Sequence, residues 1–135
     1  MICMADRTKK FAVRVFALID HIPESRKGRV IQYQLAEAAS SVAANYRAAQ
    51  RSRSRAEFIS KLSIAFEETD ESRLWIELLL DAGMLPQRLV SALLKEGDEL
   101  CAILAASRNT ARRNAGSVKQ PTKSLDFKKA SPADK

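Results

Sequence analysis

Apolar residues recur at intervals of three and four along the first 115 residues of this 135-residue chain, the spacing of one face of an α-helix. The pattern is strongest in two predicted helices that flank a basic turn between Arg51 and Arg55. Residues 29–50 carry apolar side chains at Ile31, Leu35, Ala38, Val42 and Tyr46. Residues 56–82 carry a second stripe, made of Phe58, Leu62, Ala65, Thr69, Ser72, Ile76 and Leu79. Because both stripes are too apolar to face water, we expect other helices to cover this hairpin.

Capping residues mark both ends of the predicted helix at residues 56–82. Ser54 precedes it, and Glu57 follows Ser54 by three positions, which is the spacing of a capping box. Gly83 follows its last residue, and glycine readily takes the left-handed conformation of a Schellman motif. These signals predict a helix that begins beside the basic turn and ends just before Gly83.

Two further helices are predicted, at residues 6–22 and 86–113. Pro23 ends the first, because proline disfavours helix in the residue before it, and Arg7 lies on the outer face of that helix. Pro86 suits the first turn of the other. The connections between the four helices are short, so successive helices should return antiparallel. We therefore predict an all-α, up-down-up-down four-helix bundle.

The periodic pattern ends near residue 115, where the composition also changes. Residues 116–135 are rich in Ser, Lys, Pro and Ala, so we predict a bundle domain at 1–115 and a disordered basic tail at 116–135. Hydrophobic residues make up 46% of the chain but aromatic residues only 6%, which is typical of a helical bundle with small core side chains.

Charge and cysteine content narrow the functional classes. The formal charge of +7 favours an anionic partner such as nucleic acid, although excess positive charge also keeps a protein soluble. Two cysteines are too few for a disulfide framework. No apolar run approaches the roughly 20 residues of a membrane span, and we expect a cytoplasmic protein.

Four arginines around the basic turn are the first candidate site, and they are Arg47, Arg51, Arg53 and Arg55. A guanidinium group presents a planar fork that suits phosphate, and a helix N-terminus at the same turn also favours anions. We predict that these four residues bind nucleic acid. The alternative is a solvated turn whose arginines pair with Glu57 and other nearby acids.

Polar residues near the helical stripes are the second candidate site. We predict that Gln34, Asn45, Glu67 and Glu71 form a structural polar core. A buried asparagine must find partners for its amide, and we expect Asn45 to bond to another helix rather than to a ligand.

Carboxylates of the last two predicted helices raise the question of a metal site. They are Glu67, Asp70, Glu71, Glu96 and Glu99. Bundles that hold two metal ions combine facing carboxylates with a Glu-x-x-His motif on two helices, but this chain has one histidine. We therefore expect no metal and no cofactor, and instead pairing of the carboxylates with Arg47, Arg73 or Asn45. The sequence also lacks a glycine-rich phosphate loop and a nucleophile elbow, so we expect no enzymatic activity.

Trp75 lies outside the main stripe of its predicted helix, in a column with Lys61 and Glu68. A tryptophan on an otherwise polar column predicts an oligomer interface. A neighbouring helix or loop of the same chain is the alternative cover for it.

Several local strings resemble a bacterial family of four-helix-bundle proteins that includes proteins encoded in intervening sequences of 23S ribosomal RNA genes. The strings are Gln34-Leu35, Ser40 to Ala49, Ser54 to Ile59, Glu67 to Glu71, Glu96, Glu99-Leu100 and Ala106 to Ala111. The resemblance covers about residues 8–114. The chain departs from the family pattern at Glu37, where a basic residue is frequent, and at Gly97, where alanine is typical. Glycine inside a helix costs about 1 kcal/mol relative to alanine, and is tolerable where it allows a close crossing.

The resemblance implies a bundle that assembles into a ring, commonly a homopentamer. In a related branch, the accessory proteins of diversity-generating retroelements, a basic ring binds nucleic acid and a reverse transcriptase. We accordingly expect an oligomeric accessory or scaffold protein that binds RNA or DNA, with a protein partner such as a reverse transcriptase. The alternative is a structural or protein-interaction ring that binds no nucleic acid.

Overall fold

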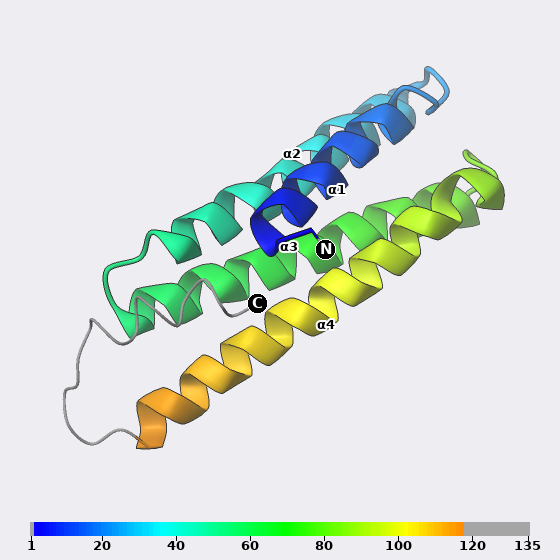
Figure 1. Ribbon diagram of the computed structural model, residues 1–135. Coiled ribbons are helices and arrows are strands. Elements are labelled where there is room, and N and C mark those ends of the chain that lie inside the picture. Colours follow the sequence, from blue (N-terminus) through cyan, green and yellow to red (C-terminus); the bar gives the residue numbers. More distant parts are fainter. Residues whose placement is uncertain (1, 118–135) are drawn as a thin grey trace.

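The computed structural model describes residues 2–117 and contains four α-helices in that range (Figure 1). Helix α1 is Met4–Ile19, α2 is Arg26–Gln50, α3 is Arg55–Asp81 and α4 is Gln87–Ser117. No strand is present in the described part of the chain, so the predicted all-α, antiparallel four-helix bundle is confirmed. Helix α4 continues to Ser117, two residues past the predicted domain boundary, and the rest of the predicted tail lies outside the described residues.

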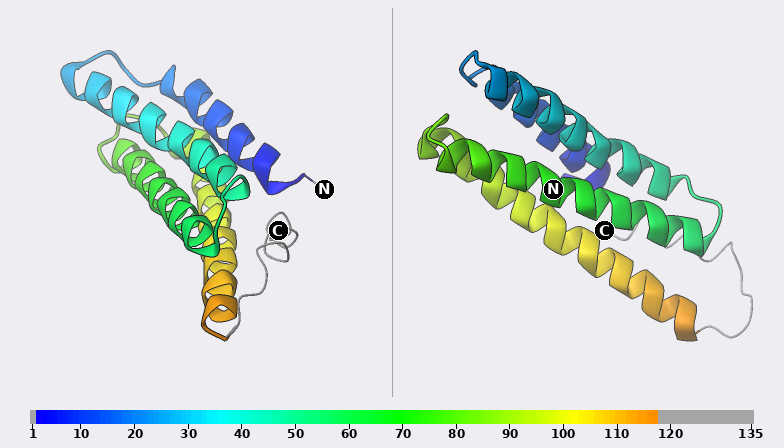
Figure 2. Two further views of the ribbon diagram at one scale, coloured as in Figure 1. Left: turned by 90° about the vertical axis from the view of Figure 1, so that its left-hand side faces the viewer. Right: turned by 180° about the vertical axis from the view of Figure 1, so that it is seen from behind.

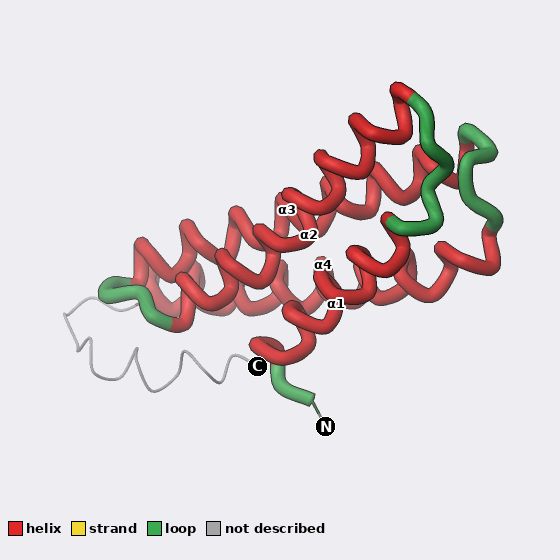
Figure 3. The backbone as a smooth tube through the Cα atoms, turned by 90° about the horizontal axis from the view of Figure 1, so that it is seen from above, coloured by secondary structure: helices red, strands yellow, loops and turns green. Residues whose placement is uncertain are grey.

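Helices α2 and α3 form a long antiparallel pair, with α4 packed along α3 and α1 along α2 (Figures 1 and 2). Helix α1 has 16 residues, whereas the other three have 25, 27 and 31. At 1.5 Å per residue α1 spans about 24 Å and α3 about 40 Å, so α1 accompanies only part of the bundle. Figure 3 shows α1 at the end that holds the α1–α2 and α3–α4 loops. The opposite end consists of α2, α3 and α4.

The predicted apolar stripes form the core of the bundle. Leu35 of α2 and Leu62 and Ile76 of α3 have no exposed surface. Thr69 is equally buried, and its hydroxyl donates to the Ala65 carbonyl of its own helix over 2.8 Å. Small side chains whose polar groups are satisfied within α3 let the neighbouring helices approach it closely.

Both predicted ends of α3 are confirmed. At its start the Ser54 hydroxyl accepts a hydrogen bond from the Glu57 N–H over 3.0 Å. The Glu57 carboxylate accepts from the N–H of Arg53 over 3.1 Å, one residue before the position that a capping box uses. At its end Gly83 has a φ of 73° and lies within the hydrogen bonds of a Schellman motif.

Gly97 of α4 is buried because the side chain of Arg73 from α3 lies across it. A Cβ atom at position 97 would stand 2.6 Å from Arg73 Cγ and 3.0 Å from Arg73 Cδ. Beyond this point the Arg73 guanidinium group reaches Asp98 at 2.6 Å and Asp70 at 2.9 Å. The close crossing suggested by this glycine is therefore present, and its partner is an arginine side chain.

Candidate nucleic-acid interface

The four arginines of the predicted site lie where α2 meets α3, and we call them the basic corner (Arg47, Arg51, Arg53 and Arg55). Arg47 is in the last turn of α2, Arg51 and Arg53 are in the loop, and Arg55 begins α3. The first three are exposed and Arg55 is half-buried. The structure thus brings the predicted residues together at one tip of the bundle, at the left of Figure 1.

Exposed guanidinium groups of the basic corner remain available to an anion. None of the ion pairs among residues 2–117 includes Arg47, Arg51 or Arg53. The carboxylate of Glu57, to which the alternative interpretation assigned these arginines, accepts instead from the backbone of Arg53. The N-terminus of α3, where free N–H groups favour an anion, meets the C-terminus of α2, whose dipole has the opposite sign, so the arginines supply the attraction for negative charge at this tip.

Two serines hold the backbone of the corner loop. Ser52 is buried, and its hydroxyl donates to the Ala49 carbonyl over 2.7 Å. Ser54 caps α3 through its side chain. The arginines are therefore carried on a fixed backbone, which reduces the ordering cost of binding a ligand.

The predicted polar core is wrong for two of its four residues. Glu67 and Glu71 are exposed on α3, because the buried stripe of that helix passes through positions 65, 69 and 72 and successive residues turn by about 100°. Gln34 and Asn45 are half-buried. The Asn45 amide donates to the Ser41 carbonyl of its own helix over 2.9 Å and not to another helix.

Glu67 and Glu71 belong instead to a surface along the outside of α2 and α3. We call it the acidic–apolar face, and its residues are Val30, Tyr33, Glu37, Glu67, Glu68, Glu71, Leu74, Trp75 and Leu78. Burial, followed by the charges of Glu71, Glu37 and Glu67, raises the pKa of Glu68 above its ordinary value. Carboxylates of α2 and α3 therefore lie close enough to repel one another. Periodicity places Tyr33, which is 65% exposed, on the same side of α2 as Glu37.

Trp75 packs partly against the core of its own chain and is half-buried. Its indole Nε1–H donates to Glu71 Oε2 over 3.2 Å. Leu78, three residues further along α3, is 40% exposed. The chain's own helices thus cover one part of the tryptophan, and its remaining surface belongs to the acidic–apolar face.

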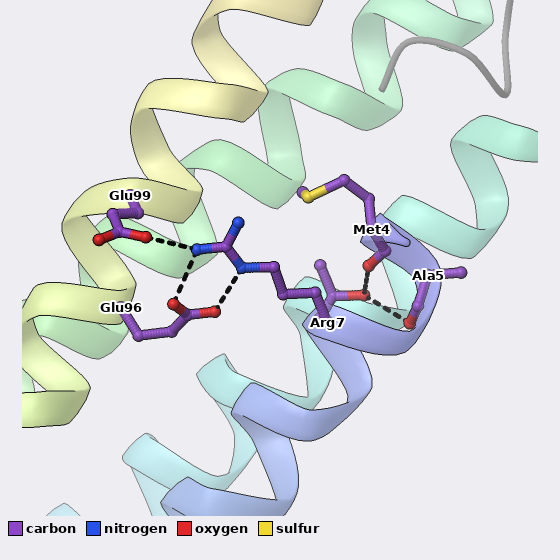
Figure 4. A network of polar contacts seen from close by, with 6 residues as sticks. Met4, Ala5, Arg7, Glu96 and Glu99 are labelled. Carbon is purple, nitrogen blue, oxygen red and sulfur yellow. Dashed lines mark hydrogen bonds and ion pairs between the residues drawn. The ribbon is translucent and has the colours of Figure 1, made fainter. Parts of the chain in front are cut away.

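An arginine holds the α4 carboxylates that raised the question of a metal (Figure 4). Arg7 of α1 donates to Glu96 from Nε over 2.7 Å and from Nη2 over 2.8 Å, and to Glu99 from Nη2 over 2.6 Å. The outward placement predicted for Arg7 is therefore wrong, because α1 turns this residue toward α4. The hydrogen bond from Arg7 lowers the pKa of Glu96.

Asp70 pairs with Arg73, as the sequence led us to expect for carboxylates of this group. Within residues 2–117, no group of three or more His, Cys, Asp or Glu side chains is arranged to hold a metal ion. None of the helices described there combines the length and apolarity needed to cross a membrane.

Fold and surface together define a small all-α bundle protein with an exposed basic corner and an acidic–apolar face. The chain belongs to the family of 23S rRNA-intervening sequence proteins, whose family model matches residues 3–106. The resemblance found in its local strings is thereby confirmed.

A solved structure has the same architecture. It is the crystal structure of a protein of unknown function from the S23 ribosomal protein family of Bacteroides thetaiotaomicron. The two chains are 30% identical with a TM-score of 0.71, and the match covers 76% of this chain and 94% of that one. Among curated proteins there is no significant match.

Proposed function

We propose that this chain is a non-enzymatic cytoplasmic protein that self-associates and binds nucleic acid through its basic corner. The observation that carries the proposal is the set of three exposed arginines, Arg47, Arg51 and Arg53, which form no ion pair within residues 2–117. Hydrogen bonds from arginine to phosphate are charge-assisted and often bidentate. The net charge of +7 adds long-range attraction toward an anionic polymer.

We expect charge reversal in the basic corner to remove this binding. The variant Arg51→Glu/Arg53→Glu should lose about tenfold or more in affinity at about 50 mM salt, because two attractive phosphate contacts become repulsive. The measurement is an anisotropy titration of a labelled RNA hairpin with single-stranded flanks, which offers paired and unpaired nucleotides together.

A matched control variant distinguishes the effect of the binding site from the effect of net charge. The variant Arg26→Glu/Arg88→Glu changes the net charge equally, using two exposed arginines at the other end of the bundle. It should retain affinity within about threefold, because distant charges are screened. Equal loss in both variants would refute the basic corner as the binding site.

The acidic–apolar face supports a second candidate function, a structural or protein-interaction ring. Val30 and Tyr33 of α2 and Leu74 of α3 each leave half or more of their surface in water. A cluster of exposed large apolar side chains rimmed by carboxylates is typical of a protein–protein contact. A neighbouring copy of this chain would cover the face, and the family resemblance implies five copies in the ring.

Charge placed in the acidic–apolar face is expected to dissociate the oligomer. Tyr33→Glu/Leu78→Glu should reduce the light-scattering mass from a multiple of 15.0 kDa to that of a single chain, because carboxylates buried in an apolar contact are costly. The emission of Trp75, the single tryptophan, should shift to the red in parallel. Val13→Glu/Phe16→Glu on α1 is the control, since these residues are also exposed but lie outside the face. A wild-type mass of 15.0 kDa would refute the ring.

A further inference from the structure

We propose that the basic corner recognises double-stranded nucleic acid, contacting the phosphates of both strands and reading no bases. This inference rests on the proposed function and specifies its ligand. The preference for a duplex depends on which chemical groups are exposed at the described part of the corner and which are buried there.

The aromatic side chains next to the basic corner are buried. Tyr46 and Phe58 flank it in α2 and α3, and each is only 4% exposed. Tyr33 is exposed, but it lies 14 residues before Arg47 on α2, or about 21 Å away along the helix. Proteins that bind single strands stack bases on exposed aromatic rings. Residues 2–117 provide no such platform near the corner arginines.

The two serine hydroxyls of the corner loop and the amide of Asn45 already take part in hydrogen bonds within the chain. The Ser52 hydroxyl is buried and donates to a backbone carbonyl, and the Ser54 hydroxyl accepts from the Glu57 N–H. The Asn45 amide donates to its own helix. Gln50 is an exposed amide, but without stacking it has nothing to fix the plane of a base against it. What the corner offers to a ligand is chiefly guanidinium, which suits phosphate.

The carboxylates of the acidic–apolar face limit the length of the site. Glu37 lies ten residues before Arg47, or about 15 Å along α2. Glu68 lies beside it on α3, where burial and then the neighbouring charges of Glu71, Glu37 and Glu67 raise its pKa. A single strand is normally bound along an extended positive groove, and here such a path would run into these carboxylates.

A duplex suits a short site better than a single strand does. Double-stranded DNA carries one charge per about 1.7 Å of its axis, so about 9 phosphates lie within 15 Å, twice the density of one strand. The three exposed guanidinium groups at one tip can therefore meet phosphates from both strands without wrapping the ligand.

The test uses the full-length protein. It compares the protein's affinity for a blunt RNA duplex of about 20 base pairs with its affinity for one of the two strands alone, chosen to be unstructured. We expect the duplex to bind at least about fivefold tighter than the single strand. The logarithm of its association constant should fall with the logarithm of salt concentration with a slope of about −3, as expected for three phosphate contacts. A second duplex of scrambled sequence should bind within about twofold.

Each outcome has a distinct meaning. Equal or tighter binding of the single strand, or a strong preference between the two duplexes, overturns this inference and leaves the proposed function standing. Absence of binding to every form overturns both. A full-length variant with Lys119, Lys123, Lys128 and Lys129 changed to Gln should keep the duplex preference, and loss of that preference would move the site to the C-terminal segment.

Discussion

Gly97→Val is expected to lower the free energy of unfolding by about 3 kcal/mol, as overpacking of a filled site does. The added Cβ would lie 2.6 Å from Arg73 Cγ, which is near the base of that side chain and cannot swing aside freely. The Arg73 guanidinium group is also held by Asp98 and Asp70. Urea denaturation followed by circular dichroism measures the loss, provided that the slope with denaturant is unchanged.

A mutant cycle shows whether Arg73 is the cause. In the native background Gly97→Ala should be neutral or destabilising, because the clash offsets the gain in helix propensity. In an Arg73→Ala background the clash is gone, and Gly97→Ala should stabilise by about 1 kcal/mol. An identical effect of Gly97→Ala in both backgrounds would contradict the contact.

The positions of the four helices follow from local sequence, but their ends were predicted less evenly: α1 ends at Ile19 and not at residue 22, and α2 begins at Arg26 and not at residue 29. The capping serine at position 54 and the glycine at position 83 act within a few residues, so the bounds of α3 were predictable to within one residue. Gly97 also signalled a close approach. Its partner Arg73 lies 24 residues earlier on another helix, and only the packing of α3 on α4 brings the two together.

The basic corner was predictable because its four arginines fall within nine residues around one capped turn. Whether these arginines pair with acidic side chains depends on how α3 is rotated about its own axis, and the sequence does not determine that rotation. The same rotation explains the error at Glu67 and Glu71. Helical periodicity already separated both from Thr69, a residue of the buried stripe, and this signal was available in the sequence. The role of Arg7 could not be foreseen, because it depends on how the short α1 lies against α4.

The acidic–apolar face and the basic corner lie on the same α2–α3 hairpin, and their separation has a physical consequence. At the corner itself the Glu57 carboxylate accepts from the backbone N–H of Arg53, whereas the carboxylates of the acidic–apolar face lie about 15 Å or more from Arg47, where salt screens most of their effect. A ring contact through the face would leave the corner of every copy free. Weak phosphate contacts could then add through multivalency.

Arg7→Ala is expected to cost about 2 kcal/mol of stability at neutral pH, because it removes the charge-assisted hydrogen bonds that join α1 to α4 and leaves Glu96 and Glu99 without their partner. Arg7→Lys should recover only part of the loss, since an ammonium group cannot form the two-pronged contact with Glu96. Lys9→Ala, an exposed position on the same helix, is the control and should change stability by less than about 0.5 kcal/mol.

The effect of Arg7→Ala should also depend on pH in a defined direction. Arg7 holds the folded-state pKa of Glu96 below its ordinary value, so the stabilisation is present at neutral pH and is lost as the pH falls through the folded-state pKa. The difference in unfolding free energy between wild type and Arg7→Ala should therefore shrink from pH 7 to about pH 3. A difference that stays constant over this range would show that Arg7 stabilises the bundle through packing of its aliphatic chain and not through its charge.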